Sequence, residues 1–322
     1  MARLVLRRLA LLPITLWLVH FFGFTYALVV RPIRAARNPF FAGLAEPVPI
    51  LPAYSEYMQT ALGSGLGQMP GSKEAIAEAI GRAAGASVGL LLIATTLSIA
   101  VGLALGLAAV RHNPPRVSRG MTILSTIGLA TPSFYLGTIF IVVMFTYVLS
   151  RGAGTPMPLP TQGFGWDTHL ILPALALMLR PAVQIARVTS GLLVTELDKP
   201  YIVAARSLGH NWRSIRWHVA LRNVIAPMIL TISGAFRLLM AELIVVEWLF
   251  KWPGIGHLLA TALVPALGTD AQEAPMFLNP PVIAALLVVF AAIFLVTDLI
   301  AALLVHAADP RLRAHEPDKT LA

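Results

Sequence analysis

Five ionisable side chains interrupt two long apolar stretches of the sequence, and three of them are candidate functional residues: Arg180, Arg237 and Glu242. Charged groups at membrane depth are costly, and they usually face a charged partner or a watery path. Arg180 or Arg237 could attract a carboxylate and Glu242 an amine, a combination that would suit a zwitterion. Pairing of Arg180 with Glu242 as a structural bridge is the alternative. Arg237 and Glu242 lie about 140° apart on a helix, so they cannot simply neutralise each other.

A second group of candidate residues lies in the basic segment 195–222. Pro200 suits the first turn of a helix, which would run over residues 200–208. Gly209 then fits a stop that requires a left-handed residue. Asn211 suits the N-cap of a second helix, which we expect to continue through Arg222. The segment therefore predicts two helices joined at a glycine, and this arrangement is called the elbow below.

The elbow has features of a docking site for another protein. Ala204, Ala205 and Gly209 are small enough for a partner's groove to close over them, and Trp212 and Ile215 belong to an apolar stripe. A basic amphipathic helix lying on anionic lipid is the alternative. The residues that we expect to contact a partner are Ala204, Ala205, Arg206, Gly209, Trp212 and Ile215.

Membrane-spanning helices must position both groups of residues. The 322-residue chain is 57% hydrophobic and only 12% charged, with a mean hydropathy of +0.77. This composition excludes an ordinary cytosolic enzyme. A bilayer core needs roughly 20 apolar residues of helix. Six segments are long enough, and the fourth and fifth of them carry the internal charges: 9–30, 88–110, 120–150, 170–194, 223–250 and 276–297.

The placement of Lys and Arg predicts that both termini are cytoplasmic, because this orientation puts most of these residues inside. Residues 1–30 would be a cytoplasmic N-terminus and an uncleaved first helix, since residues 29–31 offer no small-residue cleavage site. Residues 31–83 would form an external loop, 84–310 a five-helix core that includes the segment 195–222, and 311–322 a cytoplasmic tail. The external loop should contain two short helices, one around Tyr54 and Tyr57 and one around Ile76 and Ile80.

Several chemistries are excluded by the sequence. There is no cysteine, so disulfides, thiolate metal sites and cysteine nucleophiles are ruled out. No lysine follows a glycine, so there is no phosphate-binding P-loop. The histidines are scattered and predict no metal site. The surplus of positive charge on so apolar a chain indicates cytoplasmic loops, and we expect no nucleic-acid partner.

The segment 195–222 resembles the EAA motif of ABC-transporter permeases. Ala204, Ala205 and Gly209 match the motif, whereas Val203 stands at its Glu and Arg222 at its Pro. The dipeptide/oligopeptide (nickel) importer family shares these two departures. Its B-type permease subunit is also similar in segments 3–9, 130–137, 172–175, 201–206, 218–223, 246–256 and 309–311. Arg187, Glu247 and Asp298 match positions at which that family tends to carry charge, and we expect structural roles for them.

The resemblance implies an all-α integral membrane protein with six transmembrane helices and type I ABC importer permease architecture. It implies a multi-pass subunit of a prokaryotic cell (inner) membrane that forms half of a pathway for di- or oligopeptides. The implied partners are a homologous permease subunit, two cytoplasmic ATPase subunits and an external substrate-binding protein. ATP and Mg would bind the ATPases, and this chain would hold no cofactor and perform no enzymatic reaction. The elbow would act as a coupling helix.

Two other functions remain open from the residues alone. An ion-coupled secondary transporter or channel would need a coupling-ion site within this chain, and the internal charges keep that possibility open. A membrane-anchored sensor or scaffold could use the elbow for partner binding without transport. Co-purification of an ATPase would separate the importer from both.

Overall fold

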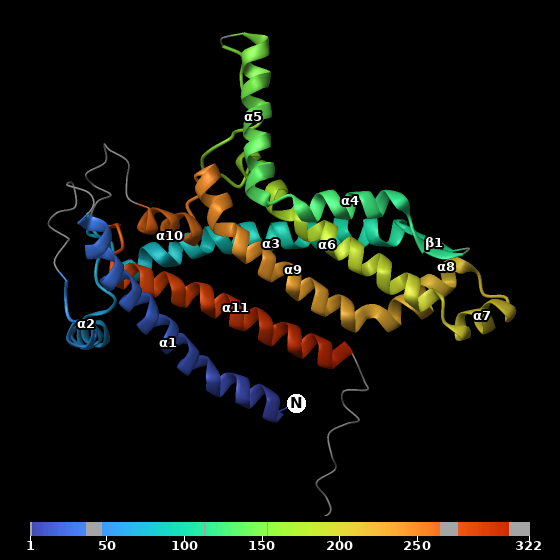
Figure 1. Cartoon of the computed structure of the whole chain (residues 1–322), viewed down its shortest axis with the longest axis horizontal. Coiled ribbons are helices and arrows are strands. Elements are labelled where there is room, and N and C mark those ends of the chain that lie inside the picture. The colour runs from blue at the N-terminus through green and yellow to red at the C-terminus, as the bar shows by residue number, and fades with distance from the viewer. Residues whose placement is uncertain (1, 37–46, 113, 153, 265–275, 309–322) are drawn as a thin grey trace, which may run out of the picture. The chain divides into compact units, whose positions relative to one another are not determined.

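The computed structural model describes residues 2–36, 47–112, 114–152, 154–264 and 276–308, and these residues are almost entirely helical (Figure 1). The tail predicted at 311–322 lies outside the described residues. Six helical stretches within the described part are long and apolar enough to cross a membrane. They are residues Ala10–Ala35, Ile76–Ala108, Ser133–Arg151, Thr168–Leu197, Trp212–Phe250 and Pro280–Ala307.

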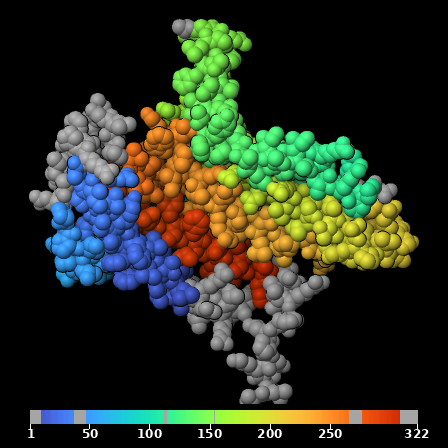
Figure 2. Space-filling model, viewed as in Figure 1, coloured from blue at the N-terminus to red at the C-terminus, as the bar shows by residue number. Residues whose placement is uncertain are grey.

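The third predicted span, residues 120–150, contains two helices. It consists of α4 (Arg119–Ala130) and α5 (Ser133–Arg151), which are separated at Thr131 and Pro132. Proline lacks an N–H and disfavours the helical conformation of the preceding residue. Thr131 is accordingly extended, with φ −92° and ψ 115°. Only α5 is long enough to span, and Figure 2 shows it projecting away from α4.

The chain divides into two compact units. The first contains residues 1–89, 162–164 and 247–296. In it, α2 (Ile50–Ser64) packs against α1 (Ala2–Ala35) through an aromatic cluster that includes Phe24 and Tyr54. The predicted helix around Tyr54 is thus confirmed. The prediction of a separate short helix around Ile76 and Ile80 was wrong, because these residues lie in the first turns of the continuous helix α3 (Ile76–Ala108).

The second unit contains residues 90–161, 165–246 and 297–322. Its most buried helix is α6 (Ile171–Leu197), against which α4 and the C-terminal half of α3 pack. A Cβ at Gly102 would come within 2.7 Å of the Ala182 carbonyl oxygen, and one at Gly106 within 2.9 Å of that of Ala186. Small residues at these two positions allow the close approach of α3 to α6, whereas a Cβ added at Gly81 or Gly85 would meet no atom within 4 Å.

The remaining elements are short or terminal. A two-stranded antiparallel hairpin that the sequence did not reveal, β1 (Val110–His112) and β2 (Pro115–Val117), connects α3 to α4. The last two helices of the described part are α10 (Ile255–Leu263) and α11 (Pro280–Ala308). A short helical turn, η2 (Thr168–Leu170), precedes α6.

Candidate functional site: the elbow and the charges within the spans

The first half of the elbow folds as its local signals predict. Helix α7 (Pro200–Ser207) begins at Pro200 and is followed by Gly209, whose φ is +87°. A left-handed φ of this kind costs glycine almost nothing and disfavours most other residues. Asn211 then caps the next helix by accepting a hydrogen bond from the Ser214 backbone N–H at 2.7 Å.

The second half of the elbow does not end at Arg222. One turn of α-helix, α8 (Trp212–Ser214), leads into a π-helical turn, η3 (Ile215–Ala220), and then into α9 (Leu221–Phe250). The whole stretch is continuous with the fifth span. The apolar sequence beyond Arg222 gives the helix no reason to stop. The second half of the elbow is therefore continuous with a helix long enough to span a membrane.

The elbow rests on a hydrophobic core that includes Leu193 of α6, Ile202 of α7 and Ile215. Two further contacts tie it down. The Arg206 guanidinium lies 4.5 Å from the centre of the Trp212 ring, and Arg216 donates a hydrogen bond to the Val110 carbonyl at 3.1 Å. Ile215 is fully buried, so it supports the elbow from within and offers no surface.

The outer surface of the elbow is formed by a different set of residues. Ala204, Arg206 and Gly209 are exposed, while Ala205 and Trp212 are partly buried. Sequence reasoning missed Val203 and Leu208, two apolar side chains that are 69% and 80% exposed. The apolar residue at the Glu position of the EAA motif was the available signal. Exposed apolar side chains beside Arg206 and Arg213 make a mixed surface that suits a protein partner.

The charges within the spans form two separate pairs. Arg180 of α6 donates from Nη1 to Oε1 of Glu242 on α9, which is the structural bridge considered above. Arg237 pairs instead with Asp298 of α11, Nη2 to Oδ1 at 3.3 Å. Arg237 and Glu242 thus meet different helices, as their angular separation requires.

The two pairs differ in their surroundings. Arg180 and Glu242 are mostly buried, and Nε of Arg180 and Oε2 of Glu242 have no hydrogen-bond partner. The side chains of Arg237 and Asp298 are 52% and 45% exposed, near the middle of their helices. A half-exposed ion pair at this depth is unfavourable against lipid. The second pair therefore requires a polar or protein environment.

Glu247 is a structural anchor for α10 within the first unit. Its buried carboxylate accepts hydrogen bonds from Ser87 Oγ at 2.6 Å and from the backbone N–H groups of Gly256 at 2.7 Å and His257 at 3.2 Å. Gly254 leaves room for this carboxylate, because a Cβ there would collide with it. The arrangement fits the structural role that we expected.

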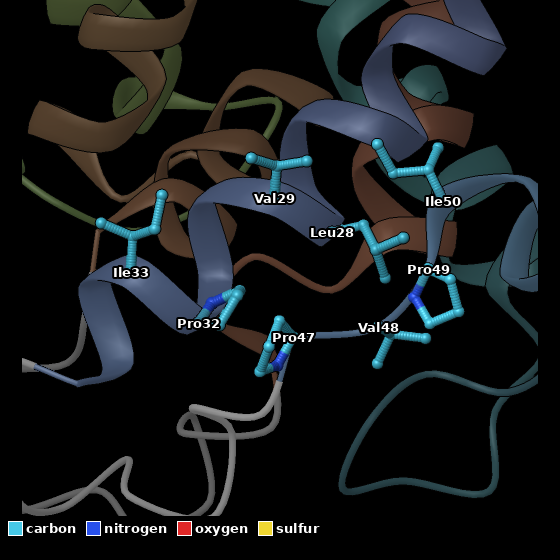
Figure 3. A pocket seen from close by; sticks show the side chains of 8 residues that line it. All are labelled: Leu28, Val29, Pro32, Ile33, Pro47, Val48, Pro49 and Ile50. Atoms are coloured by element: carbon cyan, nitrogen blue, oxygen red, sulfur yellow. The ribbon is translucent and has the colours of Figure 1, made fainter.

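An apolar hollow of about 590 Å³ lies between the C-terminal end of α1 and the chain leading into α2 (Figure 3). All eight residues that line it have apolar side chains: Leu28, Val29, Pro32, Ile33, Pro47, Val48, Pro49 and Ile50. The hollow offers no side-chain donor or acceptor to a polar ligand. No group of three or more His, Asp or Glu residues that could hold a metal ion occurs in the described part of the chain.

Comparison with known proteins identifies the family. Residues 98–314 match the model of the binding-protein-dependent transport system inner membrane component. The oligopeptide transport system permease protein AppB of Bacillus subtilis (strain 168) is 31% identical over 199 residues, which are 61% of this chain and 59% of that protein. The glutathione transport system permease protein GsiC of Shigella flexneri serotype 5b is 33% identical over 208 residues, 64% and 60% of the two chains.

A putative peptide transport system permease protein of Brucella abortus (strain 2308) is 34% identical over 197 residues, which are 60% of this chain and 58% of that protein. The chain thus matches about three fifths of the length of these curated relatives. The family match covers more than half of the chain and includes the elbow and both charged pairs. The chain therefore belongs to the family of binding-protein-dependent transport system inner membrane components, which are multi-pass membrane subunits of transporters and not enzymes.

Proposed function

We propose that the chain is the permease subunit of an ATP-driven importer and forms half of a pathway for di- or oligopeptides. An external binding protein would deliver the cargo, a homologous permease would supply the other half, and two cytoplasmic ATPases would bind ATP and Mg. The names of the relatives support peptides as the cargo class. The missing P-loop supports an energy source in a partner subunit.

The observation that carries this proposal is the elbow. It presents Val203 and Leu208 to solvent, it stands on a packed core, and it continues without a break into a membrane span. These properties suit a coupling element. A partner can contact the exposed side chains, the packed core supports the elbow from beneath, and the continuous helix can transmit a displacement of the elbow to the membrane. Ala204, Ala205, Arg206, Gly209, Trp212 and Ile215 remain the proposed coupling residues, with Ile215 acting from the core.

We further propose that Arg237, together with Asp298, faces the translocation pathway. The half-exposed charges favour a hydrated face at this point of α9 and α11. Arg180 and Glu242 would contribute to the same pathway less directly, because this ion pair is mostly buried. A peptide has polar groups along its whole length, so a path with a few charged points in an apolar wall can admit many sequences.

The test is purification of the tagged full-length chain, co-expressed with its partner subunits, followed by measurement of the ATP hydrolysis that it retains. The informative variant is Leu208→Asp, which places a charge on the exposed surface without touching the core. Its matched control is Leu62→Asp on α2, where the side chain is 83% exposed. We expect the Leu208→Asp chain to retain at most roughly one tenth of the ATP hydrolysis that the wild-type chain retains, as for substitution of a central interface residue.

The control should retain the wild-type amount. If the well-expressed wild-type chain retains no ATP-hydrolysing subunit, the importer proposal fails. Solute or ion transport by the chain reconstituted alone would then favour the ion-coupled secondary transporter or channel.

A further inference from the structure

A buried carboxylate lies at the base of the elbow, outside the residues so far given a role. Glu196 is in the last turn of α6 and is only 5% exposed. Burial of a charge is costly unless it is paired and hydrogen-bonded. The position is notable because α6 ends at Leu197 and α7 begins at Pro200, so Glu196 stands where the chain turns into the elbow.

The carboxylate is held by groups from three directions. Tyr201 of α7 donates its hydroxyl to Oε1 of Glu196. Asn223 of α9 donates from Nδ2 to the same oxygen at 2.8 Å and to the Tyr201 hydroxyl oxygen at 3.0 Å. The three side chains thus close a triangle of hydrogen bonds, which we name the joint. Lys199 Nζ lies 2.5 Å from Oε2 on the solvent side.

The joint connects the three helices that a moving elbow would have to carry. Glu196 belongs to α6, Tyr201 to α7 and Asn223 to α9. The sequence neighbours of the joint residues are buried together in one hydrophobic core, namely Leu197, Ile202 and Val224. Apolar contacts alone have no preferred direction. The hydrogen bonds of the joint add directional contacts that fix the orientation of the three helices relative to one another.

The protonation state of the tyrosine supports this geometry. Burial, together with the hydrogen bond to Glu196, raises the pKa of the Tyr201 hydroxyl to about 12. The hydroxyl consequently keeps its proton throughout the physiological range and remains a donor to the carboxylate. Deprotonation of Tyr201 therefore does not break its hydrogen bond to Glu196 in that range.

We propose that Glu196 is a positioning residue and that the joint makes the end of α6, the elbow and the start of α9 move as one body. This inference rests on the proposed function, because it assigns a route by which a force on the elbow reaches two spans. Glu196 itself is buried, whereas Tyr201 is 37% exposed and Asn223 is exposed as well. The joint determines whether displacement of α7 becomes displacement of α6 and α9 or is lost in a hinge.

The test is the distance between spin labels on α7 and α9 of the full chain in its assembled complex. The labels are attached at Ser207→Cys and Ala241→Cys, and the chain has no cysteine of its own. The distance is measured with and without a non-hydrolysable ATP analogue and Mg. In the otherwise unchanged chain we expect one narrow distance that the analogue leaves unaltered, because the two helices move together.

Two variants remove parts of the joint, namely Tyr201→Phe and Asn223→Ala. In each variant we expect a second distance between the labels, from molecules in which α7 is displaced. The fraction of these molecules should rise roughly tenfold, as for loss of a hydrogen bond to a charged group. This population should grow further with the ATP analogue, while ATP hydrolysis continues. A merely structural defect would lower the amount of assembled complex and would not separate hydrolysis from helix movement.

One control matches the tyrosine variant. Tyr135→Phe makes the same change on the exposed surface of α5 and should keep the narrow distance. An unchanged distance in Tyr201→Phe and Asn223→Ala would overturn the joint. If no ATPase assembles with the wild-type chain, the proposed function fails, and the distance in the isolated chain still decides whether the joint holds the elbow.

Discussion

At the scale of single residues, Glu247 shows how a charge within a span can serve structure alone. Its two oxygens accept hydrogen bonds from one hydroxyl and two backbone N–H groups, and Ser87 Oγ in turn accepts from the Ile255 N–H at 2.8 Å. Trp252 adds a bond from its indole nitrogen to the Ala86 carbonyl at 3.1 Å. This network attaches the N-terminus of α10 to α3 and α9.

We expect the variants of Glu247 to rank by the hydrogen bonds that they leave unmade. Glu247→Ala leaves the buried Ser87 hydroxyl and two backbone N–H groups without an acceptor. It should lower the free energy of unfolding by roughly 3 kcal/mol or more. Glu247→Gln should cost about 1 kcal/mol, because its oxygen can accept from the backbone while Ser87 turns to accept from its amide. The midpoint of thermal unfolding in detergent measures both, and equal losses would contradict this account.

At the scale of elements, local signals predicted the turns of the elbow, whereas tertiary contacts were predicted only in part, since the Arg180–Glu242 bridge was one of two alternatives. Pro200, Gly209 and Asn211 act on their own backbone, so their effects can be inferred without a structure. The partner of Arg237 could not be inferred, because it depends on how α9 and α11 pack. The π-helical turn carries no residue signal, whereas the apolar sequence beyond Arg222 is compatible with a continuing helix. The break at Pro132 did carry one, and the uncharged run concealed it.

The turn at Gly209 allows a prediction that separates backbone strain from crowding. No atom lies within 4 Å of a Cβ placed there, so only the φ of +87° opposes a side chain. Gly209→Val should therefore destabilise the turn by about 1–2 kcal/mol, and Gly209→Asn by clearly less. Hydrogen exchange of the amides at 200–214 should quicken roughly tenfold in the valine variant. Equal exchange in both variants would argue against strain at this residue.

At the scale of the whole molecule, the family match and the two compact units divide the chain differently. The match begins at residue 98, inside α3, whereas the first unit contains α1, α2 and α10. The unmatched N-terminal part is well packed all the same. His20 of α1 stacks on Tyr57 of α2, with ring centres 5.7 Å apart, and its Nδ1 lies 3.1 Å from the Tyr54 hydroxyl. The first helix is thus tied to the segment that follows it by aromatic contacts.

The proposed pathway face can be tested on the intact transporter because the chain has no cysteine. Ala241 lies one turn beyond Arg237 on the exposed side of α9, and Val142 lies on the exposed apolar surface of α5. Thiols react as thiolates, which form in water and not in lipid. A membrane-impermeant thiol reagent should therefore modify Ala241→Cys roughly tenfold faster or more than Val142→Cys, since each unit of thiol pKa changes the thiolate fraction about tenfold.

Arg237→Met should slow the reaction at position 241, because loss of the cation removes both water and a positive charge that favours the thiolate. Arg82→Met, on an exposed arginine of the other unit, is the control and should leave the rate unchanged. Equally slow reaction at positions 241 and 142 would mean that this side of α9 lies against lipid or protein. The ion pair of Arg237 and Asp298 would then be a structural contact, and the path would have to run along another face.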